Sequence, residues 1–224
     1  MSVAPKLLIF DVDGTLIDSQ DHIHAAMAQA FAAHGQSLPP RDQVLGIVGL
    51  SLPEAVARLV PDLPADIRAG IVAAYKASFG PLRATTPAPL YPGARQVLDD
   101  LRGRDTVVLG VATGKSHRGL DHVLQAHGLE GYFLTRQVAD NHPSKPHPSM
   151  ILAALAETGI DPENAVMIGD TSFDMDMGRA AGIATIGVAW GYHPVSALHA
   201  AGAGRVIDGY AALIPALMQH WGAL

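Results

Sequence analysis

Short apolar runs alternate with amphipathic segments along most of the chain. Residues 7–10, 107–112, 165–168 and 184–187 have the length and composition of buried strands, and residues 132–134 and 205–207 form two weaker runs. Between them, apolar residues recur every three or four positions, and each stripe ends at a glycine, as helices do. Strands that alternate with helices predict an α/β fold, a doubly wound parallel sheet with right-handed crossovers. The helical stripes are Val97, Leu98 and Leu101 before Gly103; Leu120, Val123, Leu124 and His127 before Gly128; and Ile151, Leu152 and Leu155 before Gly159.

Residues 18–89 break this alternation, because they contain helical stripes and no convincing buried strand. Prolines separate the stripes, and the proline-rich residues 86–89 and 91–93 lead back to the alternating pattern. We therefore predict an α/β catalytic core at residues 1–16 and 90–224, interrupted by an inserted α-helical cap domain at residues 17–89. The three stripes are Ile23, Met27, Ala30 and Phe31; Ala55, Leu59 and Val60; and Ile67, Ile71, Ala74 and Tyr75.

Composition narrows the class of protein. Hydrophobic residues make up 49% of the 224 residues, which is enough for a buried core. The net charge is -6 and no Lys/Arg-rich run occurs, so we expect no nucleic-acid partner. No apolar run approaches the roughly 20 residues that span a bilayer, no signal-peptide pattern is present, and no cysteine occurs. We expect a cytoplasmic protein without membrane partners, whose oligomeric state the composition leaves open.

Polar residues follow three of the predicted strands directly. Asp11 and Asp13 follow the first, Thr113 follows the run at 107–112, and Asp170 and Asp174 follow the run at 165–168. Ligands of open parallel sheets bind at the carboxyl ends of the strands, near the point where strand order reverses. These side chains are therefore expected to meet at one edge of the sheet.

Several carboxylates at one edge require a compensating positive charge. Like charges about 4 Å apart repel by roughly 1 kcal/mol in water and by several times more in a partly dry site. A set of oxygen ligands favours Mg²⁺, which binds proteins through a few carboxylates and substrate phosphate. Lys145, in a proline-flanked loop, is expected to supply a second positive charge.

Such a site suits phosphoryl transfer. A carboxylate beside Mg²⁺, here Asp11, can attack phosphorus and form an aspartyl-phosphate. Asp13, two residues further along an extended chain, points to the same side and can protonate the leaving oxygen. Thr113 can donate its hydroxyl to a phosphoryl oxygen, and Gly14 and Gly114 allow the backbone to approach the ligand closely.

These residues resemble the motifs of the haloacid dehalogenase superfamily. The segment 11–19, Asp-Val-Asp-Gly-Thr-Leu-Ile-Asp-Ser, resembles the first motif of that superfamily. Thr113 resembles the second motif, Lys145 resembles the third, and Gly169-Asp170 with Asp174 resembles the fourth. The helical insert resembles that of the subfamily that includes phosphoglycolate phosphatase. The resemblance implies hydrolysis of a small phosphorylated metabolite, with Asp11 as nucleophile and Asp13 as acid and base.

The resemblance also implies a ligand set for Mg²⁺: Asp11, the backbone carbonyl of Asp13, and Asp170, with Asp174 holding a metal-bound water or orienting Lys145. One departure is Gly114, where many relatives carry Asn, and it leaves the phosphate contact to the backbone and Lys115. The dehalogenases lack the second aspartate of the first motif, so Asp13 argues against dehalogenation.

Other interpretations stay open or are weaker. A sugar phosphomutase of the same superfamily would use the same motifs, and a phosphate-responsive binding protein would not need Asp13. The histidines lack the spacing of zinc ligands, and the glycines before Lys115 are one residue too close for a nucleotide-binding P-loop. Asp18 and Ser19 are interpreted as a helix start and Asp176 as a solvated acid. Residues 46–51 are candidate specificity residues, and His147 and His193 are weaker candidates for lining the site.

Overall fold

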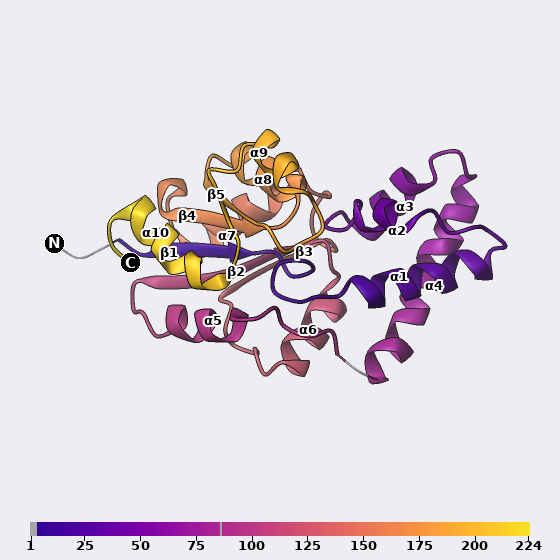
Figure 1. The fold of residues 1–224 in the computed structure, drawn as a ribbon, viewed down its shortest axis with the longest axis horizontal. Helices are drawn as coiled ribbons and strands as arrows, with labels where there is room; N and C mark the ends of the chain where they lie inside the picture. Colours follow the sequence, from indigo (N-terminus) through magenta and orange to yellow (C-terminus); the bar gives the residue numbers. More distant parts are fainter. Residues whose placement is uncertain (1–3, 86) are drawn as a thin grey trace.

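The computed structural model describes residues 4–85 and 87–224, and six strands within them form one parallel sheet (Figure 1). The strand order is β3-β2-β1-β4-β5-β6, so the direction of winding reverses between β1 and β4. This is the doubly wound sheet that the sequence predicts. The strands are β1 (Lys6–Phe10), β2 (Val107–Thr113), β3 (Thr135–Val138), β4 (Ala165–Gly169), β5 (Ala184–Val188) and β6 (Arg205–Ile207).

Helices cover both faces of the sheet because its central strands are apolar on both sides. Leu8 and Phe10 of β1 pack towards α5 (Ala94–Arg102), α6 (His117–Ala126) and α10 (Leu213–Trp221). Leu7 and Ile9 pack towards α7 (Ser149–Thr158) and α8 (Ser172–Ala180), and α9 (Val195–Ala200) packs against α8. Short 3-10 helices occupy Pro162–Asn164 and Tyr210–Ala212. In the described part of the chain, no helix has both the length and the apolar character to cross a membrane.

Two details of the predicted pattern are wrong. The strand expected at residues 132–134 lies at Thr135–Val138, because Phe133 packs into the core from a turn while Leu134 is 66% exposed. The strand is at the edge of the sheet and pairs only with β2, so it lacks the continuous apolar run of a central strand. Leu152, placed on the buried stripe of α7, is 49% exposed, and Ala154 contributes to that buried face instead.

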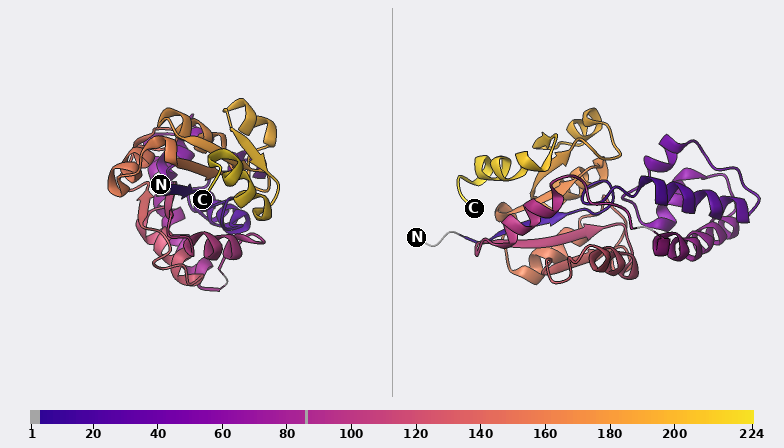
Figure 2. Two further views of the ribbon diagram at one scale, coloured as in Figure 1. Left: turned by 90° about the vertical axis from the view of Figure 1, so that its left-hand side faces the viewer. Right: turned by 60° about the horizontal axis from the view of Figure 1, so that its bottom comes forward.

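Four helices between β1 and β2 form a separate group with its own apolar core. They are α1 (Gln20–Ala33), α2 (Arg41–Leu45), α3 (Leu52–Leu59) and α4 (Ala65–Thr85). Met27, Phe31 and Ile71 of the expected stripes are buried between them. In the second stripe Leu59 and Val60 are only partly buried, and Val56, which was not expected there, is fully buried instead. The group lies beyond the end of the sheet opposite to the chain termini (Figures 1 and 2). It therefore faces the edge where the strands end.

The two segments that join this group to the sheet run side by side. Ile17 forms an antiparallel bridge with Leu90, and the Asp18 amide donates to the Pro89 carbonyl at 2.8 Å. The Tyr91 amide donates to the Leu16 carbonyl at 3.0 Å on the other side of the bridge. Thr86, the first residue of the proline-rich hinge expected at 86–89, lies outside the described residues, as do residues 1–3 of the core.

Phe31→Ala is expected to destabilise the helical group by about 3–5 kcal/mol, because it removes a fully buried ring. Urea unfolding followed by circular dichroism measures the loss. Met218→Ala on α10 is the control, since Met218 is 45% exposed and should change stability by no more than about 0.5 kcal/mol. Equal effects of the two substitutions would contradict the assigned core.

Candidate active site

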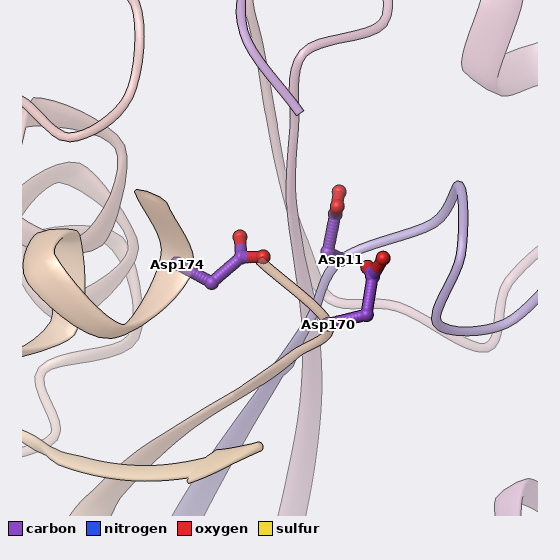
Figure 3. A group of neighbouring side chains, drawn as sticks. All are labelled: Asp11, Asp170 and Asp174. Carbon is purple, nitrogen blue, oxygen red and sulfur yellow. The ribbon is translucent and has the colours of Figure 1, made fainter. Parts of the chain in front are cut away.

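Three buried aspartates meet where the winding of the sheet reverses. Asp11 directly follows β1, Asp170 directly follows β4, and Asp174 lies in the first turn of α8. One carboxylate oxygen of each lies within 4.8 Å of the others, and all three side chains are buried (Figure 3). The convergence expected from the strand ends is therefore present, with Asp11 from the segment after β1 and Asp170 and Asp174 from the segment after β4.

Lys145 brings a positive charge into this cluster from the loop between β3 and α7. Its ammonium lies 3.0 Å from Asp11 Oδ1 and donates to Asp174 Oδ1 at 2.6 Å, and its side chain is fully buried. Burial disfavours the ammonium, but the two carboxylates outweigh it and raise the pKa of Lys145 above its usual value. Lys145 is therefore held as a cation between two acids.

Asp11 is held less firmly than its neighbours, because its one close polar partner among the described residues is the Lys145 ammonium, 3.0 Å from Oδ1 and outside regular hydrogen-bond geometry. The pKa of Asp11 is raised to about 7: burial is the largest cause, the Lys145 ammonium opposes it, and the Asp174 and Asp13 carboxylates add to the rise. Buried oxygens that lack hydrogen-bond donors are costly unless another partner satisfies them. The carboxylate is therefore available to a cation or to an electrophile.

Asp170 is held rigidly by uncharged donors. The Thr15 hydroxyl donates to Asp170 Oδ1 at 2.9 Å, and the Tyr192 amide donates to Oδ2 at 2.9 Å. Gly14 packs so closely that a Cβ placed on it would lie 2.1 Å from Asp170 Oδ2. Burial, followed by the Asp174 and Asp11 carboxylates, raises the pKa of Asp170 well above its usual value. The close approach expected of Gly14 is thus made to this carboxylate.

Asp13 lies outside the cluster of three, on the side that faces the helical group. Its Oδ2 lies 2.8 Å from Lys115 Nζ, and its Oδ1 accepts a hydrogen bond from the Ser19 hydroxyl. Ser19 also contacts the Tyr192 hydroxyl, with its Oγ at 3.0 Å. Ser19 precedes α1 as expected, but its side chain does not cap the helix and binds Asp13 instead.

Thr113 and Gly114 line the site from the end of β2. Thr113 is buried, and its hydroxyl accepts a hydrogen bond from the Lys115 amide at 3.3 Å. Helix α6 begins only after Ser116, whose hydroxyl caps it by accepting from the Gly119 amide at 3.1 Å. Residues 114–116 therefore form a short loop between β2 and α6, and this loop lines the cavity.

A cavity of about 540 Å³ opens above these residues, between the sheet and the helical group. Asp11, Asp13, Thr113 and Lys115 contribute to its wall from the sheet side. Helices α1, α3 and α4 and residues 47–50 enclose it from the other side. A volume of this size is typical of small-molecule sites, so Asp11 and Asp13 lie in the wall of a candidate ligand cavity.

The segment 46–51 joins the helical group to the loops that carry the aspartates. His193 Nε2 donates to the Gly46 carbonyl at 3.1 Å, while its Nδ1 accepts from the Ser172 amide at 3.1 Å. The Ser51 amide donates to the hydroxyl of Ser144, which precedes Lys145, at 2.8 Å. A Cβ on Gly114 would lie 2.5 Å from the Leu50 carbonyl. The small residue after Thr113 therefore makes room for this segment.

Several of these contacts were not predicted from the sequence. Tyr192 and Thr15 support Asp170, and Ser19 supports Asp13, although none has a spacing that indicates this role. His193 bonds to both the helical group and the loop after β4 without lining the cavity, and the His147 ring, which accepts from the nearby Ser149 amide at 3.2 Å, does not line it either. The half-exposed Asp176, next to Arg179, takes no part in the cluster, as predicted.

A doubly wound sheet with a carboxylate cluster at its switch point belongs to the class of α/β proteins that bind ligands at the strand ends. The haloacid dehalogenase-like hydrolase family matches residues 8–188. The chain belongs to this family, so the predicted family and the predicted hydrolase class are confirmed.

Relatives with assigned names extend over most of the chain. Probable phosphatase IndB of Dickeya dadantii is 34% identical over 94% of this chain and 92% of its own length. A phosphoglycolate phosphatase of Agrobacterium fabrum is 31% identical over 95% of this chain and 92% of its own length. Tyrosine-protein kinase PtkA of Mycobacterium tuberculosis is 35% identical over 84% of this chain but only 64% of that protein. The likeness to phosphoglycolate phosphatases that the motifs indicate is therefore present in the whole sequence.

The fold is shared with solved structures as well. A hydrolase from Pseudomonas syringae superposes with a TM-score of 0.85, covering 96% of this chain and 98% of that one, at 24% identity. At this identity the likeness concerns the fold, and it includes the inserted helices because both chains are covered almost completely.

Gly14→Ala is expected to weaken divalent-cation binding at least tenfold, because the new Cβ would overlap Asp170 Oδ2 and displace that carboxylate. Calorimetric titration with Mg²⁺ measures the affinity. Gly35→Ala is the matched control, since Gly35 also has a positive φ of 64° but has no atom within 4 Å of the added Cβ. If both variants bind Mg²⁺ equally, the close packing of Gly14 has no role in the site.

Divalent-cation binding near pH 6 is expected to release protons. The pKa of Asp11 is raised to about 7, so this carboxyl is largely protonated at pH 6, and a bound cation favours its ionised form. Calorimetry with Mg²⁺ in two buffers of different ionisation enthalpy counts the protons. Asp11→Asn should release fewer, because only Asp170 then contributes, and an unchanged number would show that Asp11 is already ionised.

Proposed function

We propose that the chain is a Mg²⁺-dependent phosphomonoester hydrolase that forms a phosphoryl intermediate on Asp11. The supporting observation is the Asp11 carboxylate, which is buried, lies 3.0 Å from the Lys145 ammonium with no regular hydrogen bond from the described residues, and lines a ligand cavity. Its relatives named as phosphatases support the same chemistry.

The proposed reaction has two displacements at phosphorus. An Asp11 oxygen attacks the phosphorus, the bond to the leaving oxygen breaks, and Asp13 gives that oxygen a proton. Water then attacks the Asp11-phosphate, Asp13 takes a proton from it, and inorganic phosphate leaves with the Asp11 carboxylate restored. Asp13 suits this role because it lines the cavity and is positioned by Lys115 and Ser19.

Other residues would bind and orient the phosphoryl group. Lys145 lies 3.0 Å from Asp11 and can attract a phosphoryl oxygen towards the nucleophile. The Thr113 hydroxyl can donate to a second phosphoryl oxygen, and Lys115 and the backbone at Gly114 lie beside it in the cavity wall. These are the catalytic and phosphate-binding roles that the motifs predict.

The donor set fits Mg²⁺. Asp11, Asp170 and the carbonyl of Asp13 would hold it, and Asp174 would orient Lys145 or a water of the ion, since its Oδ1 accepts from that lysine at 2.6 Å. Hard oxygen donors favour this ion over softer metals. When bound, Mg²⁺ supplies positive charge that stabilises the charge developing on the phosphoryl oxygens.

We propose that residues 17–89 act as a cap domain over a catalytic core of residues 1–16 and 90–224. The paired linkers at Ile17 and Leu90 and the separate apolar core of the helices support this division. A cap over the cavity excludes water and restricts the substrate to a small phosphorylated metabolite. A cytoplasmic location, where such metabolites occur, stays a prediction.

Asp11→Asn is expected to lower phosphate release by at least about 10³-fold, because the amide cannot act as the nucleophile. The assay follows inorganic phosphate from phosphoglycolate, sugar phosphates, nucleotides and pyrophosphate, each with Mg²⁺ or with EDTA. Asp176→Asn is the control, since this half-exposed aspartate lies on α8 two residues after Asp174 but outside the cluster.

Two outcomes would oppose the proposal. Normal Mg²⁺-dependent phosphate release by the Asp11→Asn variant would show that Asp11 is not the nucleophile. Transfer of phosphate between the positions of a sugar, without release, would identify a phosphomutase instead.

A further inference from the structure

The cavity has two chemically different walls. The sheet side contributes polar residues and glycines only, and α6 presents Arg118, His122 and Gln125 towards the cavity at helical spacing. The helical group contributes mainly apolar side chains, among them Ile23, Met27 and Val48. The phosphate end therefore lies against a polar wall and the opposite side against an apolar one.

The apolar wall is built from residues that are themselves well packed. Ile23 is 5% exposed, Met27 1% and Val48 7%, and Leu50 and Ala55 beside them are also buried. They come from α1, α3 and the segment 46–51, so three separate parts of the helical group converge on one surface. These buried side chains form a packed, preshaped base, and the half-buried Ile47 and Leu52 beside them provide the apolar surface that a ligand can contact.

The position of this wall matters for the substrate. The phosphate must lie at Asp11, Thr113 and Lys145 for the proposed chemistry, and these residues belong to the sheet side. The leaving group then extends towards the helical group. A two-carbon acid such as glycolate would leave most of a 540 Å³ cavity unfilled and would present no apolar surface to the wall.

We propose that the preferred substrates are phosphomonoesters whose leaving alcohol carries an apolar body larger than glycolate, which packs against Ile47, Val48 and Leu52. This proposal rests on the proposed function, because it takes the position of the phosphate from that chemistry. The polar wall on α6 leaves room for hydrogen-bonding groups on one side of the same alcohol.

The experiment compares kcat/KM for ethyl, butyl and hexyl phosphate, whose leaving alcohols have similar chemical reactivity. The value should rise with chain length, by up to about fourfold for each methylene that becomes fully buried. Sorbitol 6-phosphate, as long as hexyl phosphate but hydroxylated along its length, should be a markedly poorer substrate than hexyl phosphate.

A pair of isosteric variants locates the effect. Val48→Thr replaces a methyl group of the apolar wall by a hydroxyl and should lower the hexyl-to-ethyl ratio of kcat/KM. Val44→Thr makes the same change at a residue that is buried in the helical group but does not line the cavity, and it should keep the wild-type ratio.

The outcomes separate this inference from the function on which it rests. Equal kcat/KM for ethyl and hexyl phosphate, or a preference for sorbitol 6-phosphate, would overturn the proposal of an apolar leaving group. The proposed phosphatase function would still stand if phosphate release depends on Asp11. A lowered ratio in Val44→Thr as well would show that the effect comes from altered packing and not from the wall. Absence of release from every ester would remove both proposals.

Discussion

The ammonium of Lys145, buried between Asp11 and Asp174, is the interaction on which the site depends. Three carboxylates within 4.8 Å would repel one another by several kcal/mol in a dry site, and one lysine offsets part of that cost. The fold makes the arrangement possible by ending β1 and β4 next to each other where the winding reverses. The remaining negative charge is the charge that the proposed divalent cation would neutralise, and the bound cation would in turn attract phosphate.

The environments of the carboxylates are unequal, and this inequality separates their roles. Asp170 accepts hydrogen bonds from Thr15 and from the Tyr192 amide, and Asp174 is held by Lys145 and by the Thr171 amide at 3.0 Å. Asp11 is as deeply buried, but among the described residues it has only the Lys145 ammonium beside it and no hydrogen bond of regular geometry. The firmer support of the other two acids leaves Asp11 as the carboxylate that the proposed reaction can use as a nucleophile.

Periodicity and the rule about strand ends were sufficient to predict the sheet, the helical insert and the convergence of Asp11, Thr113 and Asp170. They failed at β3, because an edge strand with Arg136 and Gln137 has no continuous apolar run. They also missed Ser19 and Tyr192, which meet across 173 residues of chain. A hydroxyl that supports a carboxylate leaves no pattern in the sequence, since its partner is determined only by packing.

The bridge between Ile17 and Leu90 restricts how the two parts of the molecule can move. Two independent linkers would allow the helices to slide in any direction, whereas two linkers hydrogen-bonded to each other favour rotation about one line. Under such a rotation, a point moves in proportion to its distance from the axis. The segment 46–51, which makes the contacts to His193 and Ser144, is further along the chain from the bridge than the start of α1 beside Ser19. It would therefore travel further than the start of α1. Opening would therefore be a lever motion, in which a small angular change at the bridge breaks the distant contacts first.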